Sequence, residues 1–172
     1  MTAVSRIYQR LLASGAGLMM ALVFAIIFVN SLRRYTTGKS LSWGEELPIY
    51  LAIYGVMFGI GLAYLQDRHI RFTLLTDIIS PLTRKWLFAA MDAATIVIGL
   101  TLAWSGLEFA SRRPQIEASG LISGARELAG STGLLWLEWL GRMGTWQSAI
   151  VFGGIILAVA ALIRLLVRLQ ES

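Results

Sequence analysis

Residues 42–71 read SWGEELPIYLAIYGVMFGIGLAYLQDRHIR, and this stretch decides the fold. Within it, residues 47–65 form a run of nineteen residues without a charged side chain. An α-helix of that length spans roughly 30 Å, which is about the thickness of the hydrocarbon layer of a bilayer. Charged residues follow closely on both sides of the run, so they would lie at opposite faces of the membrane. The stretch therefore predicts a transmembrane helix.

The start of this helix can be interpreted in two ways. Ser42 and Glu45 have the spacing of a capping box, which would make Ser42 the N-cap. Pro48 would then kink a helix that already runs from Trp43, because proline has no backbone N–H group. In the second interpretation, Pro48 marks the true first turn of the helix, where proline is well tolerated.

Small residues recur every four positions within the run, at Gly55, Gly59 and Ala63. This spacing places them on one face of the helix, where another helix can approach closely within the lipid. The sequence therefore predicts that these three positions serve helix packing.

The composition of the whole chain indicates the same class of protein. Of its 172 residues, 56% are hydrophobic, and several apolar runs approach the length of a spanning helix. The chain has no cysteine, which excludes disulfides and thiol chemistry. The net charge is +5, but the basic residues flank the apolar runs, as is typical at membrane–water interfaces. We therefore expect the lipid bilayer, and no nucleic acid, as a partner.

The run lengths predict an all-α integral membrane fold in which residues 1–172 form one domain. A signal peptide is the rival interpretation of the first run, but Arg33 and Arg34 follow that run in place of a small-residue cleavage site. We therefore expect four transmembrane helices, near 11–32, 47–65, 86–110 and 144–167. Two shorter amphipathic stretches, near 72–79 and 131–141, are predicted to lie as helices in the membrane interface.

The orientation in the membrane cannot be predicted from the charges. Four spans place both termini on one side of the membrane. That side would hold eight of the Lys and Arg residues, and the other side would hold seven. A difference of one does not decide the orientation under the positive-inside rule.

A carboxylate lies inside the third predicted span, at Asp92. Such a group is costly at membrane depth, and it suggests an ion or proton pathway. Alternatively, Asp92 bonds a neighbouring helix, or it lies close to the lipid headgroups. Near the end of the same span, Glu108 and Arg112 have the spacing of a favourable helical ion pair.

The other polar positions give little support to catalysis. His69 is the only histidine, and it cannot form a metal site alone. Glu45 and Glu46 could bind a cation or an arginine of a partner, or they could be the solvated start of a helix whose dipole favours carboxylates. The sequence carries none of the common phosphate-binding, nucleophile, zinc or thiol motifs of enzymes. We therefore expect no enzyme activity, no metal and no cofactor.

Taken together, the motifs resemble those of a known family. Trp43, Glu45 and Glu46 open the second span, and Arg68 and His69 follow that glycine-rich helix. With four predicted spans in 172 residues, this pattern resembles the small membrane subunit of tripartite ATP-independent periplasmic (TRAP) transporters, the DctQ-like family.

The resemblance implies a subunit of the bacterial cytoplasmic membrane with both termini in the cytoplasm. Its partners would be a large multi-span subunit, which carries the sodium and substrate sites, and a periplasmic binding protein that delivers an organic acid. The small subunit would be a non-catalytic scaffold for the large one, and its motif residues would serve assembly.

Two other hypotheses remain open at the level of the residues. The first is a self-sufficient small transporter that is coupled to protons through Asp92. Against it, the spans contain few polar groups and no pair of broken helices in matching halves, which such transporters usually have. The second is a membrane-embedded enzyme, which the missing motifs disfavour.

Overall fold

The computed structural model of the protein describes residues 3–66, 80–112 and 119–170. Over these residues the chain is almost entirely helical and contains no β-strand. The helices in chain order are α1 (Ala3–Thr37), α2 (Glu46–Leu65), α4 (Pro81–Arg112), α5 (Ser119–Thr132), the 3-10 helix η1 (Leu135–Gly141) and α6 (Met143–Gln170).

The fold is an all-α membrane fold, which confirms the predicted class. Four helices, α1, α2, α4 and α6, are long and apolar enough to cross a membrane. Each of them contains one of the predicted spans and extends beyond it. The amphipathic stretch predicted near 72–79 lies outside the described residues.

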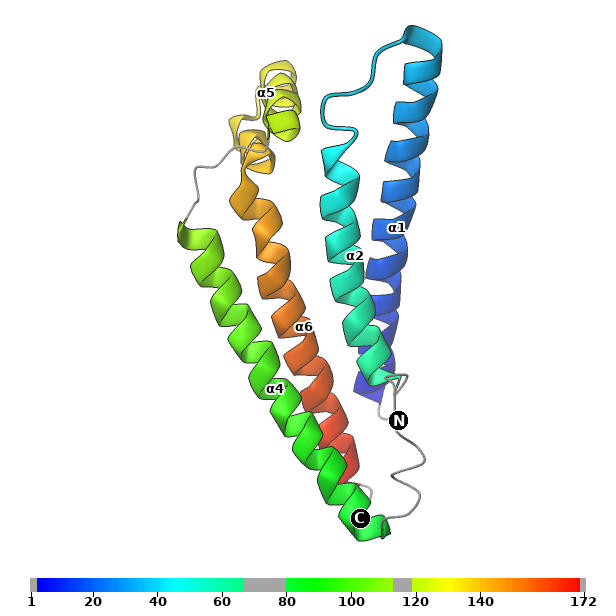
Figure 1. Cartoon of the computed structure of the whole chain (residues 1–172), viewed down its shortest axis with the longest axis vertical. Helices are drawn as coiled ribbons and strands as arrows, with labels where there is room; N and C mark the ends of the chain where they lie inside the picture. The colour runs from blue at the N-terminus through cyan, green and yellow to red at the C-terminus, as the bar shows by residue number, and fades with distance from the viewer. Residues whose placement is uncertain (1–2, 67–79, 113–118, 171–172) are drawn as a thin grey trace.

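The four long helices contact one another in the order α1, α2, α6, α4. Figure 1 shows α1 beside α2 and α4 beside α6, with α5 and the α1–α2 connection at one end of the molecule. The start of α1 and the end of α6 lie at the opposite end (Figure 1). Near that end, Leu12, Leu65 and Ala160 form a small buried cluster where α1, α2 and α6 meet. Because the contacts follow a row, each long helix keeps a broad exposed apolar surface.

Small residues allow α4 and α6 to pack closely. A Cβ atom added to Gly99 would lie 2.7 Å from the carbonyl oxygen of Gly154 and 2.8 Å from the backbone nitrogen of Ala158. A Cβ atom on Gly154 would lie 2.5 Å from the backbone nitrogen of Ala103. These separations leave no room for a side chain, so the two backbones touch through their small residues, as membrane helices often do.

Aromatic residues join the two helix pairs at the level where α6 begins. The Tyr54 hydroxyl donates to the carbonyl oxygen of Thr145 at 2.9 Å. The Tyr50 ring stacks on the Trp146 ring with 5.4 Å between their centroids. Both contacts connect the first half of α2 to the first turn of α6, and so they fix the spacing of the two pairs at this end.

The predicted interfacial helix near 131–141 is wrong in its bounds. Residues up to Thr132 belong to α5, and a 3-10 helix follows from Leu135. Gly133 separates them with φ +72°, a left-handed conformation that glycine adopts without strain, and its N–H donates to the carbonyl oxygen of Ala129 at 2.9 Å. Helix α5 is not among the predicted helices, because residues 111–130 are rich in glycine, serine and arginine, which is typical of a polar connection.

The second interpretation of the start of α2 is the correct one. The helix begins at Glu46, its N-cap is Glu45, and no side chain caps it. Pro48 therefore lies in the first turn, where its missing N–H group is not needed. The capping-box interpretation is wrong, because the Ser42 Oγ atom lies 3.2 Å from the Ser123 Oγ atom of α5 instead.

Candidate functional site

The motif residues at the start of α2 hold α5 against the bundle. The backbone N–H of Gly120 donates to the Glu46 carboxylate at 3.2 Å. Since Gly120 lies in the first turn of α5, this carboxylate binds an otherwise unpaired N–H group and faces the positive end of the helix dipole. A Cβ atom on Gly124 would lie 2.6 Å from the Trp43 indole, so only glycine lets α5 approach the ring this closely.

The same turn is anchored to α1 on its other side. The backbone N–H of Leu41 donates to Asn30 Oδ1 at 2.7 Å. Gly44 is buried against the Asn30 side chain, and a Cβ atom there would lie 2.6 Å from Asn30 Cγ. Asn30, a polar residue within an apolar span, thus shapes the connection that carries the motif.

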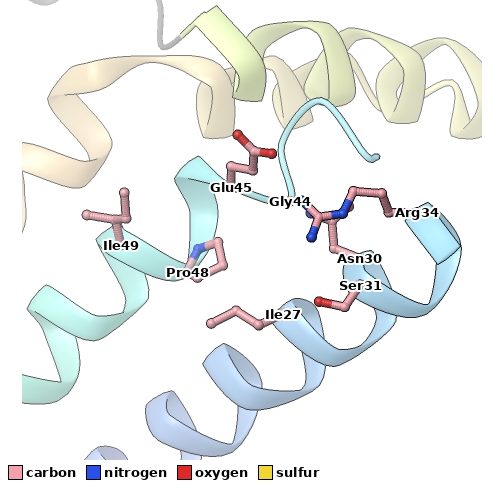
Figure 2. Close-up of a pocket in the computed structure, with 8 residues that line it drawn as sticks. All are labelled: Ile27, Asn30, Ser31, Arg34, Gly44, Glu45, Pro48 and Ile49. Carbon is pink, nitrogen blue, oxygen red and sulfur yellow. The ribbon is translucent and has the colours of Figure 1, made fainter. Parts of the chain in front are cut away.

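A pocket of ≈ 290 Å³ lies beside this turn, between the last turns of α1 and the first turn of α2. Figure 2 shows Arg34 reaching from α1 towards Gly44, while Glu45 extends from the start of α2. Ile27 and Pro48 line the apolar part of the pocket. Glu45 is exposed, and among the described residues its side chain makes neither an ion pair nor a hydrogen bond. The two motif carboxylates therefore differ: Glu46 is engaged with α5, and Glu45 borders a pocket.

Asp92 lies at the other end of the bundle and connects three helices. The residue is 3% exposed. Its Oδ2 atom accepts from Arg168 Nε of α6 at 2.6 Å, and its Oδ1 atom accepts from the Tyr64 hydroxyl of α2 at 2.6 Å. The Arg168 guanidinium also lies 4.7 Å from the centroid of the Phe88 ring, a favourable cation–π contact. Of the alternatives for Asp92, the contact with neighbouring helices is the one that the structure contains.

The predicted packing stripe on α2 is divided among different surroundings. Gly55 is buried, and a Cβ atom there would lie 3.3 Å from Met19 Cβ of α1. A Cβ atom on Gly59 would have no other atom within 4 Å, and Ala63 is half-buried. Gly61, which the stripe does not include, packs against Ile156 of α6 instead. The stripe is therefore covered by α1 at Gly55 and open at Gly59.

Glu108 and Arg112 form the predicted ion pair, with 3.5 Å between Oε2 and the guanidinium. Arg68 and His69 lie outside the described residues. Within the described ranges, no group of three His, Cys, Asp or Glu side chains could hold a metal ion.

Several residues that contact Asp92 or the motif turn were not predicted, although the sequence contains signals for them. In an antiparallel arrangement of four spans, the ends of the second and fourth helices lie beside the start of the third. Tyr64, Arg168 and Asp92 stand near those points, so their convergence could have been inferred from the order of the spans. Gly120 and Gly124 are four residues apart, a spacing that permits close approach of a helix.

Four apolar helices with polar contacts at both ends define a multi-pass membrane protein. A sequence comparison matches residues 19–171 to the family described as "Tripartite ATP-independent periplasmic transporters, DctQ component". Because the match covers most of the chain, the protein belongs to this family and is the small membrane component of a TRAP transporter. No individual curated protein matches the chain significantly.

Proposed function

We propose that this chain is a non-catalytic scaffold within its transporter. The large subunit would carry the sodium and substrate sites, and a periplasmic binding protein would deliver an organic acid. The observation that supports this proposal is the state of Asp92, the carboxylate buried within the long helices. Both of its oxygens are occupied by side chains of its own bundle, Arg168 and Tyr64.

This arrangement argues against a self-sufficient proton-coupled transporter. A coupling carboxylate must exchange its proton with water on each side of the membrane in turn. Asp92 is 3% exposed, and its two oxygens accept hydrogen bonds from Arg168 and Tyr64 of its own bundle. A carboxylate that is buried and engaged in this way suits a structural contact better than a proton relay.

The exposed surfaces of the long helices agree with a role in a larger membrane assembly. In α1, only 6% of the most apolar window is buried within the chain, so lipid or other helices must cover the rest. Gly59 on α2 offers an open position where a partner helix could approach closely. We propose that Gly59 and Ala63 form part of the surface that binds the large subunit.

The motif residues would serve assembly and not ion coupling. Trp43 and Glu46 fix α5, and Glu45 lies beside a pocket at the same end. A sodium site needs several buried oxygens, which this solvent-facing turn does not supply. We propose the same assembly role for Arg68 and His69. We also propose that both termini are cytoplasmic, which would place α5 and the motif turn on the periplasmic side of the bacterial inner membrane.

Reconstitution tests the scaffold proposal. Liposomes with a sodium gradient would contain the purified chain alone, the large subunit with the binding protein, or all three components. We expect organic-acid uptake only when all three are present, and no uptake by the chain alone. Uptake by the lone chain that is abolished by Asp92→Asn would contradict the proposal and support the small-transporter hypothesis. Alkaline phosphatase fused after Ser172 tests the orientation separately, because enzyme activity there would place the C-terminus outside the cytoplasm.

A further inference from the structure

The geometry points to a binding site for a zwitterionic phospholipid headgroup, of the phosphatidylethanolamine type, in the pocket between α1 and α2. The pocket has a volume of ≈ 290 Å³ and combines one cation, Arg34, with one anion, Glu45. Its remaining lining includes the apolar residues Ile27, Pro48 and Ile49. The inference concerns a lipid of the surrounding bilayer, and it does not depend on the scaffold role proposed above.

The depth of the pocket matches the boundary between headgroups and acyl chains. Arg34 stands two residues after the first run ends at Leu32, and Glu45 stands two residues before the second run begins at Leu47. Ile27 and Ile49 lie inside those runs. The edge of the hydrocarbon layer therefore crosses the pocket, with the charged groups on the water side and the apolar residues on the lipid side.

The two charges match the two charges of an ethanolamine headgroup. A guanidinium binds a phosphate through parallel N–H donors, and a carboxylate accepts hydrogen bonds from an ammonium group. Both Arg34 and Glu45 are exposed residues that border the pocket. A choline headgroup has no N–H to donate to Glu45, and a glycerol headgroup offers no positive charge. The pocket should therefore prefer ethanolamine over both.

The surroundings favour a lipid over a protein side chain as the occupant. Ile27 is 50% exposed and Ile49 is 61% exposed, and both border the pocket. They form an apolar surface along which an acyl chain can lie below its headgroup. Helix α1 is also the long helix least covered by the rest of the chain, so bulk lipid has direct access.

Native mass spectrometry of the purified full chain tests this inference. The probes are dioleoyl phosphatidylethanolamine, phosphatidylcholine and phosphatidylglycerol, each titrated at the same concentrations. We expect phosphatidylethanolamine to bind about fivefold more tightly than the other two, the gain that one charge contact near a membrane surface gives. Glu45→Gln should remove this preference without weakening phosphatidylcholine, and Arg34→Gln should weaken all three lipids.

Matched controls separate a defined site from general surface charge. Arg33→Gln removes the neighbouring exposed arginine, which does not line the pocket, and Glu127→Gln removes an exposed carboxylate of α5. Both variants should bind the three lipids like the unchanged chain. Equal binding of all three lipids to the unchanged chain would overturn the inference, and so would an effect of Arg33→Gln as large as that of Arg34→Gln.

Two further arms identify the source of the headgroup. Water-soluble glycerophosphoethanolamine should not displace the lipid at equal concentration, because it lacks the acyl chains; complete displacement would refute a lipid site. The same titration is made on the complex with the large subunit. If Glu45→Gln lowered recovery of the large subunit but left the lipid preference intact, the pocket would be a protein interface and the inference would be wrong.

Discussion

The buried pair of Asp92 and Arg168 makes a quantitative prediction about Asp92→Asn. The asparagine keeps an oxygen that can accept from Tyr64, but it removes the negative charge that lies beside the Arg168 guanidinium. Removing one partner of a buried ion pair lowers the free energy of unfolding by about 3–5 kcal/mol. The Arg168 side chain is 17% exposed and stands in the last turn of α6, so it can regain part of its hydration. We therefore expect a loss of about 2–3 kcal/mol in the free energy of unfolding.

Thermal unfolding of the purified chain in detergent, followed by tryptophan fluorescence, measures this loss. For a chain of this size, a loss of about 2–3 kcal/mol lowers the midpoint by roughly 4–12 °C. Arg168→Gln should have a similar effect, because it leaves Asp92 uncompensated. The double variant should be less destabilised than the sum of the two single variants, because no buried charge then remains without a partner.

The exposed pair of Glu108 and Arg112 provides the matched control. Its side chains are 52% and 77% exposed, so Glu108→Gln should change stability by no more than about 0.5 kcal/mol. The reasoning about Asp92 would be refuted if Asp92→Asn were as mild as Glu108→Gln, or if the two single effects at Asp92 and Arg168 simply added.

Three further substitutions, one of them with a matched control, test the packing of the bundle. Gly154→Leu should prevent folding of the α4–α6 pair, because even a Cβ atom would touch the backbone of α4. Gly17→Leu is the control and should be tolerated, because a Cβ atom at Gly17 meets open space. The yield of monodisperse protein in size-exclusion chromatography compares the two variants. Gly59→Leu should leave the isolated chain folded but reduce co-purification of the large subunit at least severalfold, and unchanged recovery would exclude this position from the interface. Glu46→Ala should speed tryptic cleavage within α5 by a few-fold, since α5 loses a charged contact of about 0.5–1 kcal/mol at its first turn; unaltered cleavage would show that Trp43 holds the helix alone.

The sequence predicted the parts of the fold that the bilayer itself dictates. A spanning helix must be apolar over a fixed length, so the runs near 11–32 and 144–167 could be recognised without any tertiary information. Helix α5 is different, because its inward positions are mostly small. Its position depends on the Trp43 ring and the Glu46 carboxylate, which are more than seventy residues away in the sequence. Contacts over that separation cannot be derived from local patterns.

In the candidate site, too, the residues could be predicted from the sequence but their contacts could not. The sequence indicates the two motif carboxylates as a pair, but their adjacency does not distinguish their roles. Glu46 binds α5, whereas Glu45 borders a pocket. The spacing of Ser42 and Glu45 satisfied the capping-box pattern, yet the turn over residues 42–45 directs Ser42 towards α5 instead. For Asp92, the residues left several alternatives open because its partners come from two other helices.

The contacts along the bundle agree with the scaffold role proposed above. At one end, a buried ion pair with a tyrosine joins α2, α4 and α6; at the other end, α5 and the Asn30 contact fix the turn between α1 and α2. Between these ends, backbone contacts at Gly99 and Gly154 hold α4 and α6 together. Sliding of α4 along α6 would break a charged contact and separate close-packed backbones at once. We therefore expect the α4–α6 pair to keep its shape, which agrees with the scaffold role proposed above.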